Sequence, residues 1–132
     1  MRLQRKQQKL LAAAIGSSAI DPGSSFLTVG TAARLCLTVD DVNQLDNRFL
    51  NCPNVYPNRW LSIAVTNCAG ASLRWFRDTL GGEKVRQEIE LGGNGYETLN
   101  NEALSSIPGA NGVLYLPYLS GERSPIWDPY AR

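Results

Sequence analysis

The sequence contains no histidine and only three cysteines, Cys36, Cys52 and Cys68, among 132 residues. The absence of histidine excludes a histidine general base and every nucleophile that a histidine activates. No two cysteines form a Cys-x-x-Cys pair, and their number is odd, which argues against a structural zinc site and against a secreted disulfide scaffold. A reduced, cytoplasmic setting is therefore the simplest interpretation, and no metal site is expected.

Strong charge and long apolar runs are also lacking. The formal net charge is +1, which gives no reason to expect nucleic acid or an anionic membrane as a partner. No apolar run approaches the ~20 residues of a membrane span. The apolar run 10–15, which follows a basic start, is shorter than the ~7–15 residues of a signal-peptide core. Hydrophobic residues make up 43% of the chain, enough for the core of one domain of ordinary size.

Periodicity and turn residues predict the elements. Leu35, Leu37 and Val39 alternate with polar neighbours, as in a half-buried strand. Leu73, Phe76 and Leu80 share one face of a helix that Gly81 and Gly82 end. The expected elements are a helix over 2–18, strands over 25–30 and 33–39 joined tightly at 30–32, a polar loop over 40–58 with a short strand near 49–52, a strand over 60–66, the helix of Leu73, a weaker helix over 83–90, a helix over 96–107, and a strand over 113–119. The sum is an α/β fold with a short mixed or antiparallel sheet and flanking helices.

Two glycine-containing segments are candidate phosphate or nucleotide sites. The turn around Gly30 and Thr31 offers backbone N–H groups and a hydroxyl, which can cradle phosphate oxygens. Gly70 lies at a helix entrance with small neighbours, where a ligand can approach the positive end of the helix dipole. The turn around Gly30 and Thr31 can also be just a tight turn, and Gly70 can serve only close packing of the helix on a strand. The residues alone leave the ligand-binding and the structural interpretation open for each segment.

Charged residues suggest a further chemistry. Glu122 and Asp128 could serve as the acid and base of a small hydrolase, since a pair of carboxylates performs glycoside hydrolysis. The competing interpretation is that Glu122 and Arg123 anchor a loop rich in proline and glycine through hydrogen bonds. The basic N-terminal segment 1–9 is expected to be a solvated helix face.

Four motifs, taken in order, resemble the FGGY family of sugar kinases, and xylulose kinases most of all. They are residues 23–31, residues 70–78 (Gly-Ala-Ser-Leu-Arg-Trp-Phe-Arg-Asp), residues 108–112 (Pro-Gly-Ala-Asn-Gly) and residues 116–132. The last motif is the most specific, because Leu-Pro-Tyr-Leu-Ser-Gly-Glu-Arg-x-Pro is followed by Asp-Pro-x-Ala-Arg. The resemblance covers nearly the whole chain, which corresponds to about a quarter of a typical family member.

The resemblance implies a ribonuclease H-like, actin-like ATPase fold and the transfer of the γ-phosphoryl group of Mg-ATP to a sugar hydroxyl. Family members have two domains with the active site between them. The N-terminal domain supplies most sugar contacts, and the C-terminal domain supplies most ATP contacts. This chain, residues 1–132, looks like a single partial domain, the first half of such a C-terminal domain, with a divergent basic segment at 1–9.

Carried over by motif, Gly30 and Thr31 fall on the turn that approaches the ATP phosphates, and Gly70 falls on the nucleotide-contacting glycine at a helix start. Arg74 stands where related glycerol kinases present a glutamine to the nucleotide. The resemblance thus implies a cofactor site of these four residues for ATP with Mg.

One departure concerns catalysis. The family carries Gly-Gly-x-Asp-Gln before the small-residue helix, and its aspartate is the general base. Here the region reads Arg5-Lys6-Gln7-Gln8-Lys9, and no Asp or Glu precedes Asp21. We therefore expect no catalytic residue and an inactive isolated chain, derived from a truncated gene or a dissected piece. The alternative is a non-catalytic remnant that acts as an interaction module, associating through exposed sheet edges.

Overall fold

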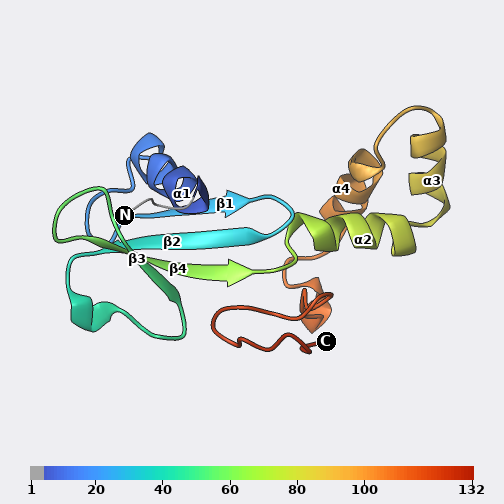
Figure 1. Ribbon diagram of the computed structural model, residues 1–132. Helices are drawn as coiled ribbons and strands as arrows, with labels where there is room; N and C mark the ends of the chain where they lie inside the picture. Colours follow the sequence, from blue (N-terminus) through green and yellow to red (C-terminus); the bar gives the residue numbers. More distant parts are fainter. Residues whose placement is uncertain (1–4) are drawn as a thin grey trace.

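The computed structural model describes residues 5–132, and of the first helix it describes side chains from Gln8 onward. A four-stranded antiparallel sheet and one helix form one half of the molecule, and a helical arm extends from the sheet (Figure 1). The sheet order is β1-β2-β4-β3. The elements are α1 (Arg5–Gly16), β1 (Ser25–Val29), β2 (Ala33–Val39), the 3-10 helix η1 (Val42–Gln44), β3 (Leu50–Pro53), β4 (Trp60–Thr66), α2 (Gly70–Leu80), α3 (Gly82–Glu90), α4 (Tyr96–Leu104) and the 3-10 helix η2 (Ala110–Gly112).

The register of the sheet separates its two faces. Phe26 of β1 lies opposite Cys36 of β2, which lies opposite Ile63 of β4, so these three side chains share a face. In β4 every second residue is buried, which is the pattern expected of a strand covered on one side. β3 pairs only with β4 and ends in Pro53, a residue suited to an edge strand because it lacks an N–H group.

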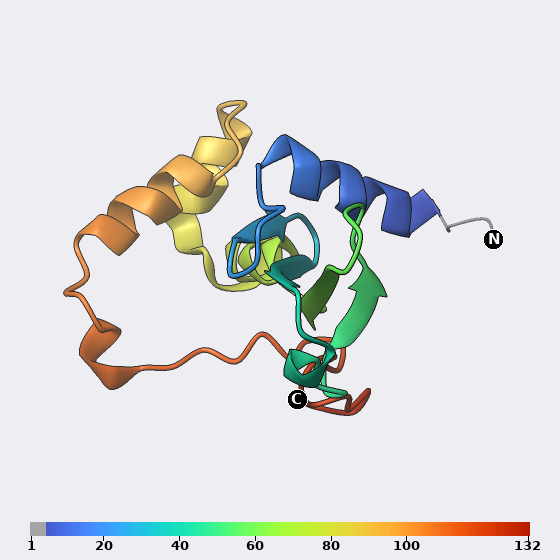
Figure 2. The same ribbon diagram turned by 90° about the vertical axis from the view of Figure 1, so that its left-hand side faces the viewer.

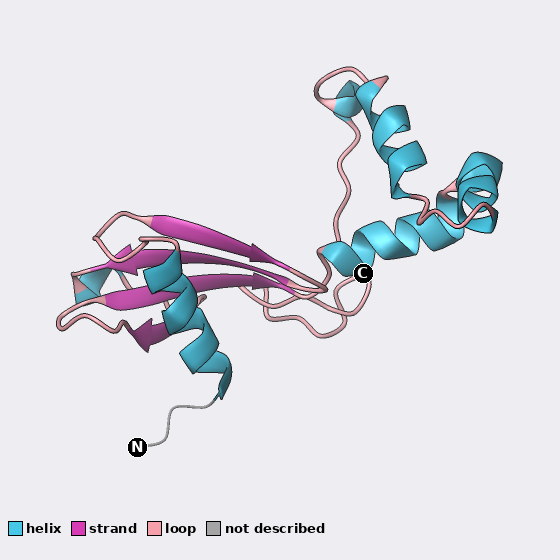
Figure 3. Ribbon diagram, turned by 90° about the horizontal axis from the view of Figure 1, so that it is seen from above, coloured by secondary structure: helices cyan, strands magenta, loops and turns pink. Residues whose placement is uncertain are grey.

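Helix α1 covers the face that Phe26 shares, and the core lies between them (Figure 3). Ala14 of α1 is fully buried, and its small side chain lets the helix lie close to the strands. The hydroxyl of Thr38, also fully buried, donates to the Ala19 carbonyl at 2.7 Å and so ties β2 to the chain after α1. The buried core comprises Leu11, Ala14, Ala19, Phe26, Cys36, Cys52, Leu61, Ile63 and Val65.

The opposite face of the sheet is apolar and bare over β1 and β2. Leu27, Val29, Leu35 and Leu37 are all exposed there, and the side chain of Val29 is 65% accessible. No helix within residues 5–132 lies over this face (Figure 3). We call these four residues the bare face.

The helical arm contains α2, α3 and α4. Helix α2 begins at the end of β4 and runs away from the sheet, and α3 and α4 fold back beside each other at its far end (Figures 1 and 3). Its own buried cluster is small and centres on Val85 and Leu99. The Glu88 carboxylate accepts hydrogen bonds from the Gly95 N–H (2.8 Å) and the Thr98 N–H (2.9 Å), which caps the start of α4 and lowers the pKa of Glu88.

The structure confirms most of the expected elements. Strands β2 and β4 have the expected bounds, β3 is the short strand expected near 49–52, and the sheet is antiparallel. Helix α1 lies within the expected range 2–18, whose first positions are outside the described residues. The last expected helix is shorter than the periodicity suggested, because α4 ends at Leu104 rather than continuing to Ile107.

The expectation of a strand over 113–119 is wrong. This segment is extended but carries no strand assignment, and Leu114 and Leu116 are 88% and 61% accessible. It crosses between α4 and the C-terminal loop as a single length of chain (Figure 2). Local propensity predicts a strand here, but a strand forms only when a neighbour supplies hydrogen bonds, and none of the four strands pairs with it.

No helix in the described part of the chain has the length and apolar character to cross a membrane.

Candidate functional site

The β1–β2 hairpin rests on the start of α2. The N–H groups of Ala69 and Gly70 donate to the carbonyls of Thr31 and Gly30, each at 2.9 Å, and the Ala71 N–H donates to the Thr31 carbonyl at 3.2 Å. The first N–H groups of a helix have no partner within the helix, and here the hairpin turn provides one. Three of the four residues assigned by motif, Gly30, Thr31 and Gly70, are therefore brought into direct contact.

Gly70 is required by this contact. A Cβ atom at position 70 would lie 2.6 Å from the Gly30 carbonyl oxygen, closer than real Cβ atoms come to other heavy atoms. The helix N-terminus therefore reaches the hairpin only because residue 70 has no side chain. Close packing accounts for this glycine, and the same contact uses the N–H group that was considered for a ligand.

Thr31 is the residue of the turn most open to a ligand. The Gly30 N–H donates to the Ala32 carbonyl at 2.9 Å, so it is used within the turn. Thr31 is exposed, and its hydroxyl and N–H make no hydrogen bond to another residue within 5–132. A hydroxyl and an N–H at the tip of a rigid hairpin can both donate to a phosphate oxygen.

Arg74 lies one turn further along α2 and is exposed. It forms no ion pair within the described residues, in contrast to Arg77, whose guanidinium bonds to Asp78 at 2.7 Å and lies over the Tyr96 ring at 4.8 Å. Arg77 thereby holds the far end of α2 against α4. Arg74 is free to reach a ligand beside the start of the helix.

A second set of hydrogen bonds reaches the same region from the C-terminal loop. Glu122 is buried, with 6% of the residue accessible, and its carboxylate accepts hydrogen bonds from the Thr66 hydroxyl (2.6 Å), the Asn67 N–H (2.9 Å) and the Arg123 N–H (2.7 Å). The Ser124 hydroxyl accepts from the Val65 N–H at 3.2 Å. We call residues 66–71 the joint, because the hairpin and this loop are both fixed to it.

The interpretation of Glu122 as a loop anchor fits this geometry better than the hydrolase hypothesis. Two of the three donors belong to the joint and the third is the N–H of the next residue, Arg123, so both oxygens of the Glu122 carboxylate are engaged. The Asp128 carboxylate accepts from the Tyr130 N–H at 2.7 Å, and Glu122 and Asp128 meet through a backbone hydrogen bond. The two residues therefore close the loop on itself, and each carboxylate accepts hydrogen bonds from backbone N–H groups of its own or neighbouring segments.

The cysteines are buried in the described structure and form no disulfide. Burial raises the pKa of Cys36 to about 11, and it also raises the pKa of Cys52. Because the thiolate is the reactive form, both thiols are inert at neutral pH. No group of three or more potential metal ligands occurs among the residues that the structure describes.

An apolar cavity of about 660 Å³ opens between α2 and the segment 113–117. Leu73 and Phe76 form its helix side, and Val113, Tyr115 and Pro117 form the other. The rings of Trp75 and Tyr115 stack with their centroids 6.5 Å apart and hold the extended segment beside the helix. Sequence reasoning gave no sign of this cavity, because it placed 113–119 in the sheet.

Residues 24–132 match the model of the C-terminal domain of the FGGY family of carbohydrate kinases. This chain belongs to that family. The match covers the hairpin, the joint and the C-terminal loop together, so the contacts described above lie within one family domain.

Named relatives of this FGGY chain include kinases of two different sugars. It is 32% identical over 115 residues to a gluconokinase of Bacillus licheniformis, covering 87% of this chain and 22% of that protein. It is also 32% identical over 121 residues to a xylulose kinase of Staphylococcus epidermidis, covering 90% of this chain and 22% of the relative. The chain therefore spans about a fifth of the length of the curated relatives it matches.

Solved structures of FGGY kinases share the fold. The ligand-bound xylulose kinase of Lactobacillus acidophilus superimposes with a TM-score of 0.74 at 28% identity, over 93% of this chain and 23% of that one. The gluconate kinase of the same organism gives a TM-score of 0.73 at 29% identity, over 89% of this chain and 22% of that one. The expected actin-like ATPase architecture is confirmed by these neighbours.

Proposed function

We propose that this chain is part of an ATP-dependent sugar kinase, which transfers the γ-phosphoryl group of ATP to a hydroxyl of a sugar such as xylulose or gluconate. The observation that carries the proposal is the docking of the β1–β2 hairpin on the start of α2 inside the matched domain. Phosphoryl transfer depends mainly on positioning and charge neutralisation, and a hairpin tip fixed to a helix start serves positioning. ATP and reduced thiols coexist in the cytoplasm, where we place the reaction.

The residues divide the task. Thr31, at the exposed tip, is assigned to the ATP phosphates together with the backbone of Gly30. Gly70 is assigned an indirect part, since it lets the helix reach the hairpin, and Arg74 is assigned to the nucleotide beside the helix. Magnesium would arrive with ATP as part of the substrate and neutralise phosphate charge.

We further propose that the isolated 132-residue chain does not phosphorylate sugar. No carboxylate precedes Asp21 in the sequence, and glutamine or lysine at 5–9 cannot take the proton of a sugar hydroxyl at neutral pH. An ADP-release assay with Mg-ATP and either D-xylulose or gluconate should show only background hydrolysis. Sugar-dependent turnover well above background would contradict this part of the proposal.

Nucleotide binding tests the site itself. Titration of Mg-ADP into isotope-labelled chain should shift the amide signals of Thr31, Gly70 and Arg74 at millimolar nucleotide, because one wall of a nucleotide site supports only weak binding. The variant Thr31→Val should reduce the shifts, whereas Thr79→Val, an exposed position further along α2, should not. Shifts confined to other parts of the chain would refute the assignment.

The bare face and the apolar cavity favour a second candidate, a non-catalytic module that associates with itself. Leu27, Val29 and Leu35 expose contiguous apolar surface of a kind that monomers rarely leave uncovered. Light scattering should then show concentration-dependent oligomers, and Leu35→Lys should weaken them. A monomer with a cooperative thermal transition at all concentrations would exclude this candidate.

A further inference from the structure

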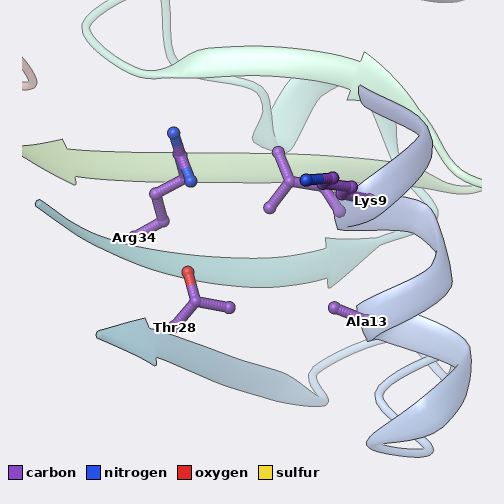
Figure 4. Close-up of a pocket in the computed structure, with 5 residues that line it drawn as sticks. Lys9, Ala13, Thr28 and Arg34 are labelled. Carbon is purple, nitrogen blue, oxygen red and sulfur yellow. The ribbon is translucent and has the colours of Figure 1, made fainter. Parts of the chain in front are cut away.

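A cationic pocket lies between the middle of α1 and the hairpin end of the sheet, on the face opposite the bare face. Its volume is about 300 Å³. Lys9 and Ala13 line it from α1, Thr28 from β1 and Arg34 from β2, and Figure 4 shows the four labelled side chains around it. The remaining lining residue is Leu10.

The pocket holds positive charge without a counter-charge. Neither Lys9 nor Arg34 forms an ion pair within residues 5–132, where Arg48, Arg59, Arg77 and Arg86 each pair with an acid. No Asp or Glu lines the pocket, and the adjoining cavity of about 210 Å³ adds Arg123 rather than an acid. Like charges that share a pocket repel, and a bound anion removes that repulsion.

The geometry suits one anionic group better than a diffuse anionic surface. Arg34 is partly buried and belongs to an inner strand of the sheet. Its backbone is fixed because β2 pairs with β1 at Thr28 on one side and with β4 at Val65 on the other. The Thr28 hydroxyl adds a neutral donor, and the small side chain of Ala13 leaves room at the helix surface. A guanidinium, an ammonium and a hydroxyl around one space match the three oxygens of a phosphate group.

We infer that this pocket binds the phosphate group of a small molecule, with the phosphate between Lys9 and Arg34. The apolar carbons of Leu10 and Ala13 border the same space, so a short carbon skeleton can accompany the phosphate. The basic segment that stands where the resemblance implies a proton-accepting aspartate thus has a different chemistry, the recognition of an anion. The inference does not depend on the proposed kinase function, since it involves neither ATP nor catalysis.

Ribose 5-phosphate, inorganic phosphate and ribose are the probes that test this inference. Titration followed by amide chemical shifts should show ribose 5-phosphate binding at least tenfold tighter than ribose, with shifts at Thr28, Arg34 and the α1 residues beside Ala13. Tighter binding of ribose 5-phosphate than of inorganic phosphate would identify a phosphate ester as the ligand. Equal affinity for ribose 5-phosphate and inorganic phosphate would identify free phosphate as the ligand. Both of these results support a phosphate site in this pocket. Equal affinity for ribose and ribose 5-phosphate would overturn it.

Charge variants locate the binding. Arg34→Gln and Lys9→Gln should each weaken ribose 5-phosphate binding by roughly tenfold, and Arg34→Lys should restore part of the loss. Arg86→Gln removes the same charge from an exposed position in α3 and should change nothing. Because Lys9 is exposed on a helix, Lys9→Gln should stay folded. It therefore tests phosphate binding even if Arg34→Gln does not fold. Unchanged affinity in Lys9→Gln would overturn the inference, and failure of this test leaves the nucleotide titration above unaffected.

Discussion

The sheet half and the helical arm are stabilised in different ways. In the sheet half, α1 and all four strands contribute to a contiguous core that includes the fully buried Leu61. In the arm, only Val85 and Leu99 among the large apolar residues are buried, while Leu91 and Leu104 are 88% and 84% accessible. Polar contacts also stabilise the arm, including the hydrogen bonds by which Glu88 caps α4 and the contacts of Arg77. Stability should therefore be concentrated in the sheet half, with the arm opening more readily.

The largest expected effect comes from the core. Leu61→Ala should lower the free energy of unfolding by about 3–5 kcal/mol, because it removes a fully buried side chain and leaves a cavity. Leu104→Ala in the arm should change it by less than about 0.5 kcal/mol, since that side chain is exposed. Urea unfolding of the two variants measures the difference, and similar values would mean that the arm shares the core of the sheet.

The joint between the two halves should be the next most sensitive place. Glu122→Gln keeps the size of the side chain but replaces a charged acceptor of three hydrogen bonds, which should cost about 1.5–3 kcal/mol and speed proteolysis of the loop 119–132. Glu102→Gln, at an exposed position in α4, is the matched control. A loop that resists protease equally in both variants would show that other contacts hold it.

Gly70→Ala tests the joint from the hairpin side. The added Cβ meets a backbone oxygen that cannot move aside without breaking the hairpin contact, so a loss of about 1–3 kcal/mol is expected. Gly16→Ala is the control, because a Cβ there meets nothing within 4 Å. Amide exchange should accelerate at Gly70 and Ala71 in the first variant. Unchanged exchange there would contradict the close approach of helix and hairpin.

The smallest expected effect is a pH dependence confined to the arm. Hydrogen bonds from Thr98 and then Gly95 lower the pKa of Glu88 below its ordinary value of 4.5. The stabilisation is therefore complete above pH 4.5 and is lost as the pH falls through the lower pKa of the folded chain. Amide exchange of α4 should accelerate in this acid range while β4 stays protected, and Glu88→Gln should remove the dependence. Simultaneous loss of protection in both halves would show that the arm does not open separately.

The sheet half could be predicted from the sequence, and the arm and the segment after it only in part. Alternation in Leu35, Leu37 and Val39 reflects burial on one side of a sheet, so periodicity alone gave β2 its correct bounds. The strand expected over 113–119 failed because pairing depends on a partner far along the chain, which local pattern does not reveal. The end of α4 at Leu104 likewise follows from exposure of Ile107, 59% accessible, which has no core to join.

The candidate site, like the fold, could be predicted from the sequence only in part. The motifs around Gly30 and Gly70 were visible in the sequence, but their contact joins residues forty positions apart and required the fold. Lys9 and Arg34 carried no local signal beyond their charge, and only the packing of α1 across the strands brings them to one pocket.

The joint also sets the direction of the arm. It fixes the direction of α2 by hydrogen bonds from the hairpin on one side and the loop on the other, with no large apolar contact between α2 and the sheet. Helix α2 is 11 residues long, about 16 Å, so a small rotation at the joint produces a larger displacement at the far end of the helix. A rotation of about 10° at the joint would carry the far end of α2 through roughly 3 Å. Any change at the joint that turns α2 would therefore displace α3 and α4, which follow it along the chain.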